Sequence, residues 1–185
     1  MAMYNNPIAY YKRAQSQNVD ALNRVAVCAT GTTAYNGTLV TLGQMNTGAA
    51  LGMNYVFPAT VTAADTAVDV WMVRAPEVPM SVLTNQFDDP RAFEIPAGTP
   101  FDIMRPMPGD IIHLSDTAFG TNQKPDSSNM WVTPTANGQY IAIASAAGKT
   151  GLVLKLQSTE PIIVGQDMVT GYVLEVVQNP NQALS

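Results

Sequence analysis

His113 is the residue best suited to acid–base or metal chemistry, and it is the only histidine in the chain. It lies in the segment DIIHLSD, between Asp110 and Asp116. If this segment is a strand, alternation places His113 on one face and both carboxylates on the other. A metal site would therefore need further ligands from distant loops. We predict a structural or surface histidine and no metal site.

Cys28 is the single cysteine, and it could act as a nucleophile if His113 served as its base. Its neighbours in the run VAVCA are apolar, however, and a cysteine in such a run is usually a small buried core residue. One cysteine also excludes an intramolecular disulfide and a cysteine-rich zinc site. No serine is surrounded by a Gly-x-Ser-x-Gly sequence. We predict that Cys28 is not catalytic.

Two further segments have residue types that can bind ions or phosphate. Asp88 and Asp89 precede a proline, with Glu94 nearby, and such carboxylates serve as acid and base in glycosidases or as calcium ligands. Adjacent acidic residues before a proline are more often a solvated turn. The segment Gly148-Lys149-Thr150 resembles the end of a phosphate-binding loop, but Ile143 stands where that loop needs a glycine. We expect a tight turn there, no cofactor, and a protein that is not an enzyme.

Runs of β-branched and aromatic residues recur along the chain. As strands, they would position the candidate side chains described above. Gly, Pro and Asn-Gly turns separate the runs at a spacing of about 8–12 residues. The expected strands are 24–29, 38–42, 55–61, 68–74, 101–104, 111–115, 130–134, 140–144, 152–156, 161–164 and 168–177. Segment 68–74 is apolar on both faces, as expected of a strand covered on two sides. The pattern predicts an all-β sandwich or barrel of short antiparallel strands with long Gly/Pro-rich loops.

Composition divides the chain into an N-terminal arm (1–23), a β domain (24–177) and a C-terminal tail (178–185). The apolar residues of the arm follow no steady period. The arm is therefore either a frayed terminus or a segment that becomes ordered on a neighbouring subunit, with tyrosines as anchors and basic residues facing an acidic surface. The candidate partner-binding residues are Tyr4, Tyr10, Tyr11, Lys12 and Arg13.

The overall composition limits the classes of partner. Hydrophobic residues make up 46% of the 185 residues, enough for a core, and charged residues make up only 12%, against about 25% in typical domains. The net charge of −5 argues against a general nucleic-acid binder. No window approaches the roughly 20 apolar residues of a membrane helix, and the N-terminus lacks the apolar segment of a secretory signal. A surface so poor in charge suits a protein that contacts other proteins.

Two segments resemble the small decoration (cement) proteins of tailed-bacteriophage heads. These are IPAGTP at 95–100 and PGDIIHLS at 108–115, each a turn that leads into an apolar strand, and the closing strand GYVLEVV at 171–177 is similar as well. The resemblance implies a virion structural protein that stabilises a capsid by bridging shell subunits. It also implies the major capsid protein as partner, a homo-oligomer, and a location on the capsid surface after synthesis in the host cytoplasm.

Two other functions remain open from the sequence. One is a β module of a phage fibre or adhesin that binds a glycan or a host surface. Trp71 or Trp131 could stack on a sugar if exposed, although we expect both to be core residues because each lies in an apolar strand. The other is an enzyme of a further type, which would depend on His113, Asp110 and Asp88 as its polar centres.

Overall fold

The computed structural model describes residues 9, 23–29, 31–45, 56–61, 65–74, 93–135, 137–164 and 166–180. These residues form strands joined by turns and one short 3-10 helix, so the prediction of an all-β protein is confirmed. The elements are β1 (Asn23–Cys28), β2 (Leu39–Leu42), β3 (Phe57–Val61), β4 (Trp71–Val73), β5 (Pro100–Met104), β6 (Ile111–Ser115), η5 (Asp116–Ala118), β7 (Trp131–Pro134), β8 (Tyr140–Ile143), β9 (Val153–Val164) and β10 (Asp167–Gln178).

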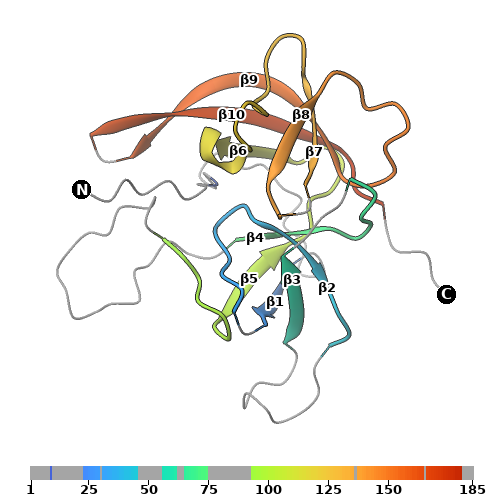
Figure 1. The fold of residues 1–185 in the computed structure, drawn as a ribbon, viewed down its shortest axis with the longest axis vertical. Helices are drawn as coiled ribbons and strands as arrows, with labels where there is room; N and C mark the ends of the chain where they lie inside the picture. The colour runs from blue at the N-terminus through green and yellow to red at the C-terminus, as the bar shows by residue number, and fades with distance from the viewer. Residues whose placement is uncertain are drawn as a thin grey trace.

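The first five strands close into a small barrel, which occupies the lower half of Figure 1. The strand order is β1-β3-β2-β4-β5, and β5 returns to pair with β1. All pairs are antiparallel except β1 with β3, which run parallel with Ala26 opposite Phe57. Alternating residues of each strand point inward and fill the barrel. The interior residues are Ala26, Cys28, Val40, Ala59, Trp71, Val73, Phe101 and Ile103.

The last five strands form one antiparallel sheet in the order β6-β10-β9-β7-β8. Its centre is a long hairpin of β9 and β10, each 12 residues long, which arches across the upper half of Figure 1. Ala9 forms an isolated antiparallel β-bridge with Leu114 on β6. The sheet is therefore extended at the β6 edge by at least this one contact.

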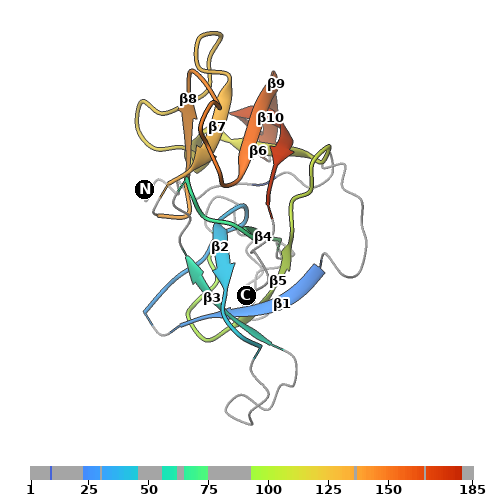
Figure 2. The same cartoon turned by 90° about the vertical axis from the view of Figure 1, so that its right-hand side faces the viewer.

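The barrel and the sheet share one hydrophobic core. The side chains of Leu39, Met72 and Met104 point outward from the barrel and pack in the same buried cluster as Leu154 and Leu174 of the sheet. β4 lies on the side of the barrel nearest the sheet in both views (Figures 1 and 2). Met72 faces the sheet, whereas its two neighbours in β4 face the barrel interior. The prediction of a strand covered on two sides is thus confirmed for this segment.

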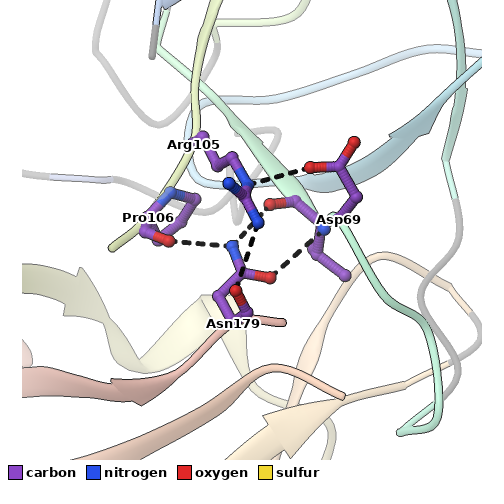
Figure 3. Close-up of polar contacts among 5 residues, drawn as sticks. Asp69, Arg105, Pro106 and Asn179 are labelled. Atoms are coloured by element: carbon purple, nitrogen blue, oxygen red, sulfur yellow. Dashed lines mark hydrogen bonds and ion pairs between the residues drawn. The ribbon is translucent and has the colours of Figure 1, made fainter. Parts of the chain in front are cut away.

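A group of buried polar contacts also joins the two halves (Figure 3). The side chain of Asn179, just after β10, accepts from the Val70 N–H (3.3 Å) and donates to the Val70 and Pro106 carbonyls (2.9 and 2.8 Å). Arg105 forms an ion pair with Asp69 (2.8 Å) and donates to the Asn179 carbonyl (3.2 Å). The end of the sheet is therefore tied to the segment before β4 and to the β5–β6 connection.

Three details differ from the expected strands. Segments 152–156 and 161–164 belong to one strand, β9, because Pro161 lies where β9 is at the edge of the sheet and a proline is tolerated. β4 covers only Trp71–Val73, since Asp69 has a positive φ of 53° and interrupts the extended chain before it. The parallel pairing of β1 with β3 was not expected from the turn pattern, which predicts neighbours only for strands joined by short connections.

Candidate functional site

His113 is buried on β6, the first strand in the order of the sheet, and has a structural hydrogen-bond partner. Its Nε2 donates to the carbonyl oxygen of Glu160 on β9, at 3.1 Å. The imidazole passes over Gly171 of the intervening strand β10, where an added Cβ would lie only 2.3 Å from Nε2. Within the described ranges, no group of three or more His, Cys, Asp or Glu side chains could hold a metal ion. The burial of His113 and its hydrogen bond to Glu160 fit the structural alternative of the prediction.

Cys28 packs inside the barrel and is 2% exposed. Burial raises the pKa of its thiol, which keeps the thiol protonated at neutral pH and weakens it as a nucleophile. His113 lies on β6 of the other sheet, so the two residues belong to separate parts of the molecule. This environment fits a small core residue.

The other candidate polar residues take part in turns or lie outside the described residues. Asp110 is buried, and its carboxylate accepts from the N–H of Met107 (2.9 Å), which stabilises the turn before β6. Lys149 forms an ion pair with Asp65 in a turn where Gly148 has a φ of +77°. A tight turn rather than a phosphate-binding loop is therefore present between β8 and β9. Asp88 and Asp89 lie outside the described residues, and Glu94 is exposed.

The two tryptophans have different environments. Trp71 is 1% exposed inside the barrel, with the Arg24 guanidinium 4.7 Å from its ring centroid. The prediction of a core residue is correct for Trp71, which leaves no face for sugar stacking. It is wrong for Trp131, which is only partly buried because it begins β7 on the face opposite the buried Val132. The Lys155 ammonium lies 5.6 Å from the Trp131 ring centroid.

The predicted partner-binding residues of the arm, Tyr4, Tyr10, Tyr11, Lys12 and Arg13, lie outside the described residues. Ala9 is the one residue of segment 1–22 that the structure describes. It is 1% exposed and packs in the common core beside Leu114. The chain therefore contacts its own sheet at this point of the arm.

The β9–β10 hairpin extends beyond the rest of the sheet, to the left in Figure 1. β6 pairs with β10 only over Gly171–Glu175, and β7 pairs with β9 only at Leu154 and Lys155. Further out, Pro161–Val164 and Asp167–Thr170 pair with each other and with no other strand of the described chain. We call these two segments the hairpin end.

The hairpin end has one packed face and one exposed apolar face. Ile162 and Val164 are 1% and 7% exposed and form a small cluster with Val169. On the other face, Ile163 and Met168 lie directly opposite each other and are 69% and 75% exposed. This patch is not predicted from the sequence. Its only signal is the run of three consecutive apolar residues in β9, which cannot all face inward from one strand.

Comparison of the chain with family models, with curated proteins and with solved structures gives no match. Among the residues that the structure describes, no helix is long and apolar enough to cross a membrane.

Proposed function

We propose that this chain is a structural protein of a bacteriophage head, which decorates the capsid surface and bridges shell subunits of the major capsid protein. The observation that carries the proposal is the hairpin end, with Ile163 and Met168 exposed side by side. The resemblance of segments 95–100 and 108–115 to decoration proteins supports it, as does the low content of charged residues.

The hairpin end has the properties of a protein-docking surface. An exposed apolar patch with a polar rim is typical of interaction sites, and the exposed Gln166 and Thr170 border this one. Since the opposite face of the ribbon is packed, the positions of Ile163 and Met168 are largely fixed before binding, which reduces the entropy lost on association. The unpaired strand edges also allow a strand of a shell subunit to add through backbone hydrogen bonds.

Repetition of the site on a symmetric shell would increase the overall affinity of the chain for the shell. A closed shell presents the same site many times, and two modest contacts on one chain act together through a high effective concentration. The second contact in this proposal is the arm, with Tyr4, Tyr10 and Tyr11 as anchors and Lys12 and Arg13 facing acidic shell surface. Because Ala9 is buried against the sheet, the arm has one fixed point of contact with the body at this residue.

The test uses undecorated head shells of the phage that encodes the chain, with binding measured by co-sedimentation. The double variant Ile163→Ser/Met168→Ser is expected to bind the shells at least tenfold more weakly, because it removes both apolar side chains of the patch. Since both side chains are exposed, the core should remain intact. The matched control is Val177→Ser, which removes an apolar side chain that is 43% exposed on the same strand. Wild-type protein that does not sediment with shells would overturn the decoration function.

Self-association is a separate part of the proposal. A decoration protein that bridges symmetric sites is expected to be a homo-oligomer, so the native mass by light scattering should exceed the 19.7 kDa of one chain. The protein could instead bind shells fully while it is monomeric both in solution and on the shell. That result would contradict the predicted homo-oligomer but not the decoration function.

A further inference from the structure

A polar cleft lies where the barrel meets the sheet, away from the hairpin end. Its volume is about 280 Å³, close to the lower end of the range of roughly 300–1,000 Å³ found for small-molecule pockets. One wall comes from the segment before β2 and from β3, and the other from η5 and the β7–β8 turn. A volume of this size suits a small ligand or the terminal unit of a larger one.

The two walls are fixed to each other by contacts across the cleft. The N–H of Leu39 donates to the Gly138 carbonyl (3.0 Å), and the Tyr140 hydroxyl donates to the Gly37 carbonyl (2.9 Å). Gly138 also packs so closely that an added Cβ would lie 2.8 Å from Val61. The cleft is therefore already formed in the unbound protein, as most small-molecule sites are.

The lining has hydrogen-bonding groups but no charge. No Asp, Glu, Lys, Arg or His side chain lines the cleft in the described part of the chain. The polar residues that line it include Thr33 and Tyr35, whose side chains carry hydroxyls, and Asn137 and Gln139, whose side chains carry amides. Within the described residues, none of these four side chains is engaged in a hydrogen bond, so their donors and acceptors are available to a ligand.

We infer that this cleft binds a neutral carbohydrate, as a sugar unit at the end of a glycan. A sugar offers several hydroxyls to the amides and hydroxyls on both walls, and its apolar face can lie on the half-buried ring of Tyr35. An apolar ligand would leave the polar lining groups unsatisfied, which is unfavourable. An anionic ligand would find no positive partner there, in a chain of net charge −5.

The inference is independent of capsid decoration, because the cleft and the hairpin end have no residue in common. It also differs from the stacking on tryptophan that the sequence suggested, since neither Trp71 nor Trp131 lines the cleft. If the chain decorates a capsid, many copies would present the cleft at once, and weak sugar binding would become strong attachment to a glycan-coated surface.

The experiment titrates the full chain with glucose, galactose, mannose and N-acetylglucosamine at millimolar concentrations, followed by NMR chemical-shift changes. At least one neutral sugar is expected to shift the amides of 33–38 and 137–140 in a saturable way. Tyr35→Ala and Asn137→Ala should each weaken that binding at least tenfold, whereas Thr150→Ala, at an exposed position outside the cleft, should not change it. Far-UV circular dichroism checks that each variant is folded.

Two results would overturn the inference. One is the absence of saturable shifts with all four sugars. The other is binding that Trp131→Ala abolishes and Tyr35→Ala leaves intact, which would place the sugar on the outer face of the sheet. Because Asn137 is exposed in a turn, its variant keeps the test valid even if Tyr35→Ala fails to fold.

Discussion

Gly171 lies at a point of the sheet where there is no room for a side chain. It lies on β10, between β6 and β9, and its missing side chain leaves the space through which His113 reaches the Glu160 carbonyl. An added Cβ would lie 2.3 Å from His113 Nε2, 2.6 Å from the Glu160 carbonyl oxygen and 2.7 Å from Ile162. The contact with the backbone oxygen cannot be relieved by a change of rotamer.

The variant Gly171→Ala is therefore expected to lower the free energy of unfolding by about 3 kcal/mol, the upper end of the usual effect of overpacking. Urea unfolding followed by circular dichroism measures it. The control is Gly98→Ala, where the new Cβ meets open space and only the positive φ of +79° is unfavourable, at about 1 kcal/mol. An equal loss in both variants would show that crowding at Gly171 is unimportant.

Asp126 organises the exposed loop between η5 and β7. Its carboxylate accepts from the N–H groups of Ser128 and Asn129, both at 2.7 Å. These backbone hydrogen bonds lower the pKa of Asp126, with a further contribution from the Asn129 side chain. A carboxyl whose pKa is lowered in the folded loop stabilises it above the pKa of the unfolded state, and this contribution is lost as the pH falls through the folded pKa.

We expect acidification to release the loop locally while the strands stay folded. The amide chemical shifts of Ser128 and Asn129 should move together in one transition, at a pH below the ordinary pKa of an aspartate. In Asp126→Asn the side-chain oxygen still accepts but does not titrate, so this transition should disappear. If it persisted in the variant, another group would control the loop.

Among the elements, β10 has the most varied role. Its middle pairs on both sides within the sheet, its beginning forms the hairpin end, and Asn179 after its last residue joins the sheet to the barrel. Asn179 is 6% exposed although it lies in the predicted C-terminal tail. Its side chain forms hydrogen bonds with the N–H and carbonyl of Val70 and with the carbonyl of Pro106. Loss of this side chain would leave these buried backbone groups without their partner.

Replacement of Asn179 by alanine is expected to lower the free energy of unfolding by about 3 kcal/mol. Each buried polar group left without a hydrogen bond destabilises the fold by roughly 1–3 kcal/mol, and water will bind some of the groups that lose their partner. Chemical denaturation gives the value. Gln157→Ala is the matched control, since its amide makes one exposed hydrogen bond, to Glu175 at 2.5 Å. A change below 1 kcal/mol in Asn179→Ala would mean that water replaces these contacts almost fully.

At the scale of the whole molecule, the barrel and the sheet are joined by both apolar and polar contacts. Leu39, Met72 and Met104 of the barrel belong to the same buried cluster as the sheet residues. Val70 belongs to this cluster too, and its backbone is hydrogen-bonded to Asn179. Neither half could expose its side of this cluster to water without losing much of its apolar burial. We therefore expect the described strands to unfold as one cooperative unit.

The variant Trp131→Phe tests this expectation, because it leaves Trp71, inside the barrel, as the single tryptophan. Its fluorescence then reports on the barrel, whereas far-UV circular dichroism reports on the strands of both halves. The two signals should give the same urea midpoint and slope. A biphasic dichroism curve, with fluorescence following only one phase, would show that the barrel and the sheet unfold separately.

Alternation and turn residues act locally, so the residue pattern was enough to predict the all-β class and the approximate position of most strands. It also indicated that segment 68–74 is apolar on both faces and that Cys28 is a core residue. Which side of the hairpin end is exposed could not be predicted in this way, because Ile162, Ile163 and Val164 are equally apolar and their burial depends on the neighbouring strands. The polar cleft likewise exists only because the folded chain brings segments about one hundred residues apart to one place.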